Sequence, residues 1–450
     1  MSLSLIGILT ILTIVALLIW NKTSPIIIMI ILPVVGALIA GFGVAEIGVF
    51  FEDGIAQVMN VVVMFIFAII FFGIMQDAGL FEPIINKMID LSGGNVVKVA
   101  VATVLIAMVG QLDGSGASTF LITIPALLPL YKRLKMNPYL LLLLIAGSAA
   151  IMNMVPWGGP LGRAASVLGM DANELWQPLI PVQIVGLLLM VGLAVLLGFR
   201  EQRKIENEYG LVDGAKAQEE TSEGNDEGPY EANSKETDSK GNSLERPKLI
   251  WVNLILALAV IGILVSGVIP SGFAFMLGVA VALLINYPNI TDQTARLRAH
   301  APSALTMAGI ILAAGLFLGV LTGSGMLDAI AEDFVTILPE GVTQYIHLIV
   351  GFLGIPFDML LSTDAYYFAL FPIIEQIAST VGVDSLSTAY AMIIGNIVGT
   401  FISPLAPAVW LALGLSGLEM GKHIRYSFFW LWGLSLVLIV VAVVFGLISV

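Results

Sequence analysis

Long apolar runs separated by short polar segments extend through the whole chain. A helix needs about 20 apolar residues to cross roughly 30 Å of hydrocarbon, and ten runs are long enough, some of them with internal breaks. These runs are residues 4–20, 25–42, 57–77, 138–168 and 177–199 in the first half, and 249–267, 270–286, 302–322, 386–414 and 424–448 in the second. The pattern predicts an all-α polytopic membrane protein whose solvent is the lipid bilayer.

Two further apolar stretches carry a polar middle. Residues 96–131 and 343–376 each consist of two apolar arms, and each arm is too short for a comfortable full crossing. We therefore expect a re-entrant helical hairpin from each stretch, with its tip inside the membrane. The alternative, two full crossings per stretch, leaves the flanking loops on the same sides of the membrane.

The two halves repeat one another at a nearly constant offset of 243–247 residues, which places Asn153 over Asn396 and Glu174 over Glu419. Because five crossings are an odd number, the second repeat starts on the opposite side of the membrane and is inserted with inverted orientation. This inverted-topology plan is typical of secondary transporters that bind substrate between the repeats. We divide the chain into scaffold helices (1–95), a hairpin with a broken helix (96–200), a linker (201–247), a second scaffold (248–340) and a second hairpin with a broken helix (341–450).

The distribution of charge predicts an orientation in the cell membrane. With re-entrant hairpins, eighteen of the nineteen Lys and Arg residues fall on one face. The positive-inside rule then places the linker in the cytoplasm and both termini outside. Residues 201–246 hold thirteen Asp or Glu and little to bury, so the linker is predicted to be an acidic disordered connector.

Composition narrows the class of protein. Hydrophobic residues make up 58% of the 450 residues and charged residues only 11%, whereas soluble domains carry roughly a quarter charged residues. This excludes a soluble enzyme and a nucleic-acid-binding protein. The chain has no cysteine and three histidines, which predicts no permanently bound zinc or haem cofactor. An intramembrane protease and a passive channel are alternatives, but no Gly-x-Gly-Asp or His-Glu-x-x-His motif occurs.

The polar middle of each hairpin combines acids with hydroxyl groups. The first tip contains Asp113, Gly114, Ser115, Ser118 and Thr119, and the second contains Asp358, Ser362, Thr363 and Asp364. Irregular backbone at this depth must be buried in protein or face a cavity, and helix N-termini with hydroxyl groups suit an anion or a hydrated cation. We expect Asp113, Gly114 and the Ser and Thr residues to bind substrate, with capping of the hairpin helices as the alternative role of the hydroxyl groups.

The fourth apolar run of each half is interrupted, at residues 153–163 and 396–407. Clusters of Pro and Gly at matching places predict half-helix ends that point at a ligand. The candidate substrate-binding residues in these breaks are Asn153, Gly158, Gly159, Asn396, Thr400 and Ser403. Arg163 directly follows the first break and can hold a carboxylate with two parallel hydrogen bonds. Its alternative role is snorkelling to the membrane interface.

These motifs resemble the CitMHS family of metal-citrate:proton symporters, which belongs to a larger ion-transporter group with sodium-coupled dicarboxylate carriers. The resemblance is carried by Ala68–Leu80, by Leu112–Thr119 and by the segment Asn153-x-x-Pro156-Trp157-Gly158-Gly159-x-x-x-Arg163. It extends through both halves apart from the linker. In the wider group, paired Ser-Asn-Thr tips hold carboxylate and sodium; here Ser118-Thr119 and Ser362-Thr363-Asp364 stand in corresponding places without the Asn.

The resemblance implies a secondary active transporter, in which hairpins and broken helices move like an elevator against a scaffold within a homodimer. The implied substrate is citrate, bound as a complex with a divalent cation and imported by proton symport. The alternative is a carrier of other organic anions, of the dicarboxylate or gluconate type, coupled to H⁺ or Na⁺. The candidates for carrying the proton are Asp113, Asp358 and Asp364, because burial favours the neutral form of a carboxyl group.

Overall fold

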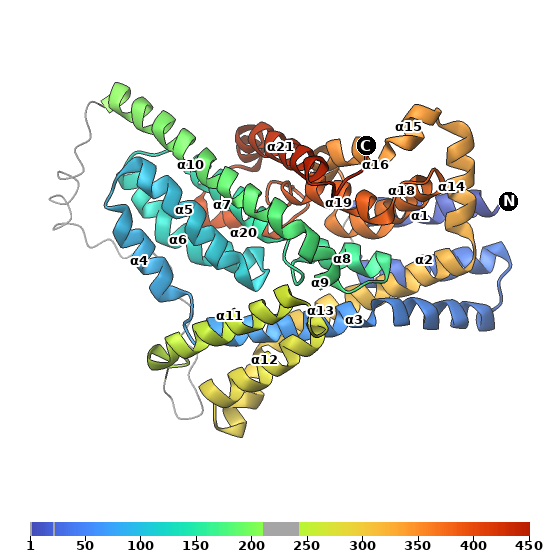
Figure 1. Cartoon of the computed structure of the whole chain (residues 1–450), viewed down its shortest axis with the longest axis horizontal. Helices are drawn as coiled ribbons and strands as arrows, with labels where there is room; N and C mark the ends of the chain where they lie inside the picture. Colours follow the sequence, from blue (N-terminus) through green and yellow to red (C-terminus); the bar gives the residue numbers. More distant parts are fainter. Residues whose placement is uncertain (1, 21–22, 210–242) are drawn as a thin grey trace.

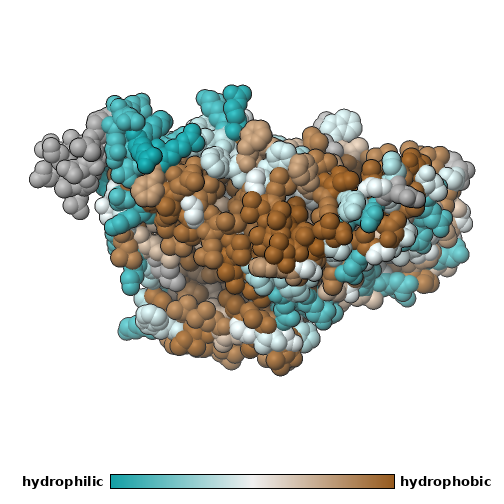
Figure 2. Space-filling view, turned by 45° about the horizontal axis from the view of Figure 1, so that its top comes forward, coloured by the Kyte–Doolittle hydropathy of each residue, from teal (hydrophilic) through white to brown (hydrophobic). Residues whose placement is uncertain are grey.

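A computed structural model describes residues 2–20, 23–209 and 243–450 (Figure 1). The regular elements among these residues are helices, and six of them are long and apolar enough to cross a membrane. The structure confirms the predicted all-α polytopic membrane protein. Figure 2 shows a broad hydrophobic area across the middle of one face, with hydrophilic residues gathered at its edges. An apolar belt with polar margins is the surface that a bilayer requires.

The second half of the chain repeats the element order of the first. The first half contains α1 (Leu3–Trp20), α2 (Pro25–Ala40), α3 (Val44–Asp77), α4 (Glu82–Ser92), α5 (Val96–Gly110), α6 (Gly116–Arg133), α7 (Pro138–Met152), α8 (Gly159–Leu168), α9 (Ala172–Trp176) and α10 (Ile180–Tyr209). The second contains α11 (Ile250–Ser266), α12 (Ser271–Asn286), α13 (Ile290–Gly323), α14 (Met326–Ile337), α15 (Glu340–Gln344), α16 (Ile346–Phe352), α17 (Gly354–Asp358), α18 (Phe371–Thr380), α19 (Ser385–Ile397), α20 (Pro407–Ser416) and α21 (Met420–Val444). Helices α1 to α3 thus correspond to α11 to α13, and α7, α8 and α10 correspond to α19, α20 and α21.

Helices α3 and α13 are the third helix of each repeat, and they pack against one another in opposite directions. A Cβ atom on Gly54 of α3 would overlap the Gly315 backbone of α13, so the two helices touch at this point. At their other ends, Asp77 of α3 lies 3.2 Å from Arg296 of α13. The sequence numbers rise along one helix and fall along the other. Because equivalent helices run antiparallel, the two repeats have inverted topology.

Three helices are longer than the apolar runs that predicted them. Helices α3 and α13 have 34 residues each, about 50 Å at 1.5 Å per residue, whereas the runs covered 57–77 and 302–322. The extra turns of α3 include the exposed acids Glu52 and Asp53, which interrupt the apolar run. Helix α10 continues to Tyr209, inside the segment predicted as linker, and residues 210–242 of that linker lie outside the described residues.

The two hairpins differ in their first arms. The first is a simple helical pair, in which α5 and α6 are joined by a short 3-10 turn and Thr103 is hydrogen-bonded to Tyr131 at 2.9 Å. In the second, the first arm is divided into α16 and α17, and the second arm begins with a π-helical segment at Ala365–Leu370. A Cβ atom on Gly354 would overlap the backbone of Gly395 in α19. The second hairpin therefore packs backbone to backbone on the neighbouring broken helix.

Both predicted broken helices are present. The first breaks between α7, which ends at Met152, and α8, which begins at Gly159. The second breaks between α19, which ends at Ile397, and α20, which begins at Pro407. Each second half-helix carries a Pro in its first turn, where the missing N–H group costs no hydrogen bond. The breaks leave backbone groups of both repeats without helical partners near the hairpin tips.

Candidate functional site

A cavity of about 350 Å³ lies where the first hairpin tip and the first break meet the long helices α3 and α13. Its polar and charged lining comes from six parts of the chain, namely both hairpin tips, both breaks, α3 and α13. These lining residues are Asp113, Ser115 and Ser118 of the first tip, Asn153 and Arg163 at the first break, Gln76 of α3, His300 and Ser303 of α13, and Thr363 and Thr400 of the second half. The cavity thus lies between the two repeats, where the inverted-repeat plan predicts the substrate.

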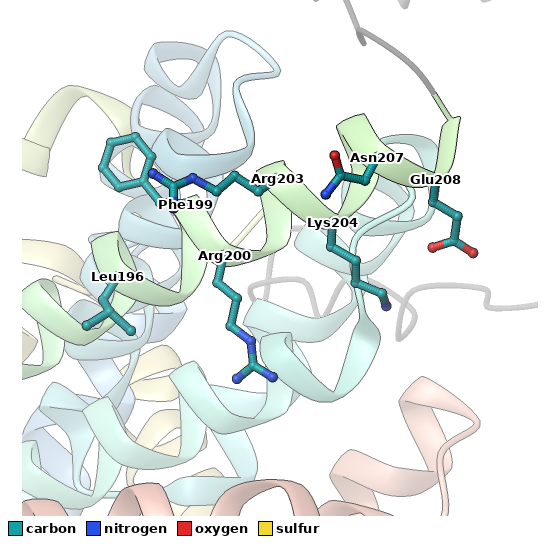
Figure 3. Close-up of a pocket in the computed structure, with 7 residues that line it drawn as sticks. All are labelled: Leu196, Phe199, Arg200, Arg203, Lys204, Asn207 and Glu208. Atoms are coloured by element: carbon teal, nitrogen blue, oxygen red, sulfur yellow. The ribbon is translucent and has the colours of Figure 1, made fainter.

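A larger hollow of about 910 Å³ follows the last turns of α10 (Figure 3). Its lining belongs to that helix alone, and its side chains do not converge. Arg200 and Lys204 point to one side of α10, while Arg203 points to another side with Phe199. No hairpin tip or break contributes to it, so the smaller cavity is the candidate site.

The first tip is held in shape by contacts that depend on its sequence. Gly114 has φ 74°, in the left-handed region that favours glycine, and a Cβ atom there would lie 3.0 Å from the Trp157 carbonyl oxygen. The Trp157 indole N–H donates to the Leu112 carbonyl oxygen at 2.8 Å. Asp113 accepts the backbone N–H of Ser115 at 2.7 Å. The tip and the first break are therefore joined, with the Asp113 carboxylate at the cavity.

The hydroxyl groups of the first tip differ in their roles: some cap helix α6 or line the cavity, and one is buried behind it. Ser115 caps α6 by accepting the Ser118 N–H at 3.3 Å, and both residues also line the cavity. Thr119 is fully buried and donates to Gln111 Oε1 at 2.6 Å, while Gln111 Nε2 donates to Asn153 Oδ1 at 3.3 Å. Thr119 is outside the cavity lining. Gln111, which sequence reasoning did not select, therefore ties the tip to Asn153 and leaves the Asn153 amide N–H groups for a ligand.

Arg163 lines the cavity, and it is already paired. Its Nε lies 2.7 Å from Asp364 Oδ1, and the two side chains are 10% and 14% exposed. This ion pair joins the first broken helix to the second hairpin tip. A Cβ atom on Gly159 would lie 2.7 Å from Arg163 Nη1, so glycine there gives the guanidinium its room. The Nη groups remain for a substrate carboxylate, but Asp364 balances the charge of the arginine.

The second half contributes fewer of its predicted residues to the cavity. Asp358 is 1% exposed, and its Oδ2 has no hydrogen-bond partner among the described residues. Asn396 is adjacent to this carboxyl group; its Nδ2 donates to the Gly354 carbonyl oxygen at 3.3 Å, and its Oδ1 is likewise unpartnered in the described structure. Ser403 donates to the Asp358 backbone oxygen at the same place. These three residues form a closed polar cluster behind the cavity wall.

The structure therefore separates the candidate residues into two groups. It brings together at the cavity Asp113, Gly114, Ser115, Ser118, Asn153, Gly159, Arg163, Thr363 and Thr400. It places outside the lining Thr119, Gly158, Ser362, Asn396 and Ser403, together with Asp358 and Asp364. Gly158 serves the break itself, because a Cβ atom there would overlap the Asn153 carbonyl oxygen, and Ser362 caps the second tip by accepting the Ala365 N–H at 3.2 Å.

Comparison with known proteins decides the family. The sequence model of the CitMHS citrate transporters matches residues 15–395. The chain belongs to this family. The citrate transporter of Bacillus subtilis (strain 168) is 36% identical over 99% of this chain and 100% of its own length. The Mg(2+)/citrate complex secondary transporter of the same organism is 37% identical over 100% of this chain and 99% of its own length.

A solved structure supports the same fold. The crystal structure of the Alcanivorax borkumensis YdaH transporter, described as having an unusual topology, aligns with a TM-score of 0.57. It is 16% identical and covers 90% of this chain and 88% of its own chain. For this CitMHS member, the family and the fold agree with the predicted multi-pass membrane transporter. A transporter rather than an enzyme is also what the family shows.

Proposed function

We propose that the protein imports citrate as a complex with a divalent cation, in symport with protons, and that the complex binds in the cavity of about 350 Å³. That volume is within the range of roughly 300–1,000 Å³ that small-ligand sites occupy. The observation that carries the proposal is the meeting of Asp113 with the Arg163–Asp364 pair at this one cavity. A relative that is 37% identical is named a Mg(2+)/citrate complex transporter, which supports the metal complex.

The charges around the cavity favour a metal complex over bare citrate. Arg163 brings one positive charge, Asp364 already pairs with it, and Asp113 adds a carboxylate. Citrate near neutral pH carries about three negative charges, and a divalent cation lowers this to about one. Among these three groups, a bare trianion would meet more negative than positive charge. A metal complex instead presents its cation to Asp113 and a carboxylate to the Arg163 Nη groups.

Asp358 is the residue that we propose to carry the proton. Asp358 Oδ2 and Asn396 Oδ1 are each without a hydrogen-bond partner among the described residues, and the two side chains lie next to one another. A proton on Asp358 would let the carboxyl group donate to Asn396 Oδ1, so each buried atom would gain a partner. Unpaired buried polar atoms are costly. Asp364 is committed to Arg163 and Asp113 faces the cavity, which leaves Asp358 for coupling.

Uptake of labelled citrate into proteoliposomes tests the function. We expect accumulation when a divalent cation is present and an inward proton gradient is imposed, and little uptake in EDTA. Equal uptake in EDTA would exclude the metal complex, and uptake that follows a sodium gradient would exclude proton coupling. A competition panel of dicarboxylates and gluconate tests the alternative carrier: stronger inhibition by one of these acids than by metal-citrate would reassign the substrate.

The proposal also includes a cytoplasmic linker, external termini, a homodimer and an elevator motion. The placement of eighteen of the nineteen Lys and Arg residues on one face supports the orientation, and the family resemblance supports the other two features. The chain has no cysteine, so single cysteines at Ser2 or Val450 can be labelled on whole cells with a membrane-impermeant thiol reagent. Labelling only after the cells are opened would reverse the orientation.

A further inference from the structure

The ends of α3 and α13 form a cluster of charged side chains beside the cavity. Asp77 Oδ2 lies 3.2 Å from Arg296 Nη1 and 2.8 Å from His300 Nε2. The three side chains are between 7% and 20% exposed, so their hydrogen bonds are largely shielded from water. This cluster has no part in the function proposed above. Its geometry fixes the orientation of the imidazole ring.

Gly73 gives the His300 ring its place on α3. A Cβ atom on Gly73 would lie 2.6 Å from both Cγ and Cε1 of the ring and closer still to Nδ1. Any other residue at this position would displace the imidazole. Gly73 precedes Asp77 by about one helical turn. Helix α3 therefore holds the ring at two points, by contact at Gly73 and by the hydrogen bond at Asp77.

The ring that is held in this way faces the cavity. His300 lines it together with Gln76, and the first tip and first break face the same space through Asp113 and Arg163. Asp77 occupies Nε2. Within the described part of the chain no hydrogen bond reaches Nδ1, so Nδ1 is the ring nitrogen left for a ligand in the cavity.

The surrounding charges decide which end of a metal-citrate complex would meet His300. Asp77 and Arg296 are the charged groups packed around the ring, on α3 and α13, and Asp113 and Arg163 belong to the first tip and first break. Asp113 attracts the cation of the complex. Arg296 repels a cation near His300. A ring that donates from Nε2 to Asp77 and from Nδ1 to a substrate carboxylate would be cationic, and Asp77 would balance that charge.

We propose that His300 contacts the substrate and binds one of its terminal carboxylates through Nδ1–H, with Asp77 as the residue that positions it. The complex then lies with its metal toward Asp113 and this carboxylate toward the long helices. The inference rests on the proposed function, since metal-citrate is the ligand. It adds a recognition residue from the scaffold to the residues of the tip and the break.

Uptake kinetics of the full chain in proteoliposomes test the assignment with citrate and citramalate, each with the same divalent cation. Citramalate lacks one terminal carboxylate. We expect His300→Gln to raise KM for citrate roughly tenfold or more, as the loss of a charged hydrogen bond does, with little change in maximal rate. Wild type should discriminate against citramalate by a similar factor, and His300→Gln should lose most of that discrimination. A merely structural role would leave the discrimination intact.

Two further variants control the result. Asp77→Asn keeps the shape of the side chain but weakens its hydrogen bond to His300. We therefore expect a partial loss of the discrimination between citrate and citramalate. Gly73→Ala displaces the His300 ring without removing it. This variant replaces His300→Gln in the test if His300→Gln does not fold. Arg298→Gln removes an exposed cation from the same helix and should change neither KM nor discrimination.

The outcomes separate this inference from the proposed function. Unchanged discrimination in His300→Gln and Gly73→Ala, with normal wild-type uptake of metal-citrate, overturns the role of His300 alone. A shift in the metal concentration needed for uptake, without a shift in discrimination, assigns His300 to the metal instead and also overturns it. Wild-type uptake that needs no metal overturns the proposed function.

Discussion

The two hairpin tips occupy equivalent positions in the two repeats, yet one is open and the other is closed. Asp113 of the first tip lines the cavity, as do the neighbouring Ser115 and Ser118. Asp358, its counterpart at an offset of 245 residues, is 1% exposed and lies behind the wall. Only Thr363 represents the second tip in the cavity. The duplication has therefore kept an acid at both tips and changed what surrounds it.

Glycine contacts account for the closed second tip. Gly351 and Gly354 allow the second hairpin to approach the backbone of α19, where a Cβ atom on Gly351 would lie 2.7 Å from the Ala391 carbonyl oxygen. In the first hairpin, a Cβ atom on Gly110 would meet only ordinary contacts, the nearest at 3.6 Å. The first arm of the second hairpin is therefore pressed against its broken helix, whereas Gly110 in the first arm of the first hairpin makes no such contact. This difference supports our proposal that the open tip binds the substrate and the closed tip carries the proton.

Arg163→Ala should have the largest effect, because Arg163 joins the first broken helix to the second tip through Asp364. We expect citrate uptake to be abolished. Removing one partner of a buried ion pair costs about 3–5 kcal/mol of stability, so the melting temperature of the purified protein should fall as well. The double variant Arg163→Ala/Asp364→Ala should regain much of the melting temperature and still fail to transport. Transport by the double variant would show that the pair is structural only.

Asp113→Asn and Asp358→Asn test the division of labour between the tips. The first change should weaken metal-citrate uptake at least tenfold, because the cation loses a carboxylate ligand. The second should retain citrate exchange across the membrane and lose accumulation driven by a proton gradient. Counterflow and gradient-driven uptake, measured on the same proteoliposomes, distinguish the two effects. If Asp113→Asn abolished the response of uptake to pH and Asp358→Asn did not, this division of labour between the two tips would be wrong.

The sequence predicted the elements of the site because their signals are local. Gly and Pro clusters marked both breaks, and acids with hydroxyl groups marked both tips. It could not show that Arg163 pairs with Asp364, because the two residues are 201 positions apart and no local pattern links them. The sequence indicated that Arg163 could bind a substrate carboxylate. The structure adds that its Nε is already paired with Asp364.

The cavity wall formed by the long helices was missed for a different reason. His300 lies just outside the apolar run that predicted its helix, since α13 begins at Ile290 and the run began at residue 302. A histidine at the edge of a predicted crossing was the only signal, and it was weak. Gln111 was passed over because it precedes the acid of the tip, although its two hydrogen bonds organise that tip.

Gly354→Ala should open the closed tip at a moderate cost. The added methyl group meets the backbone of Gly395, and such overpacking typically costs about 1–3 kcal/mol. We expect a lower melting temperature and greater reactivity of a cysteine placed at Ser403. Gly433→Ala in α21 is the matched control, because nothing lies within 4 Å of a Cβ atom there. Equal melting temperatures for the two variants would mean that the glycine contact does not close the tip.

Thr119→Val is the mildest test, because Thr119 lies outside the cavity lining and acts on the open tip through Gln111 and the Ser115 carbonyl oxygen. The change keeps the shape and removes the hydroxyl group that donates to Gln111 Oε1 at 2.6 Å, so a buried acceptor loses its partner at a cost of about 1–3 kcal/mol. Gln111 also holds Asn153, and we expect a KM for citrate that rises a few-fold with an unchanged maximal rate. Ser148→Ala, which removes a buried hydroxyl group bonded only within α7, should leave KM unchanged. A rise far above tenfold would mean that Thr119 contacts the substrate directly, and the open tip would then reach deeper than the cavity lining indicates.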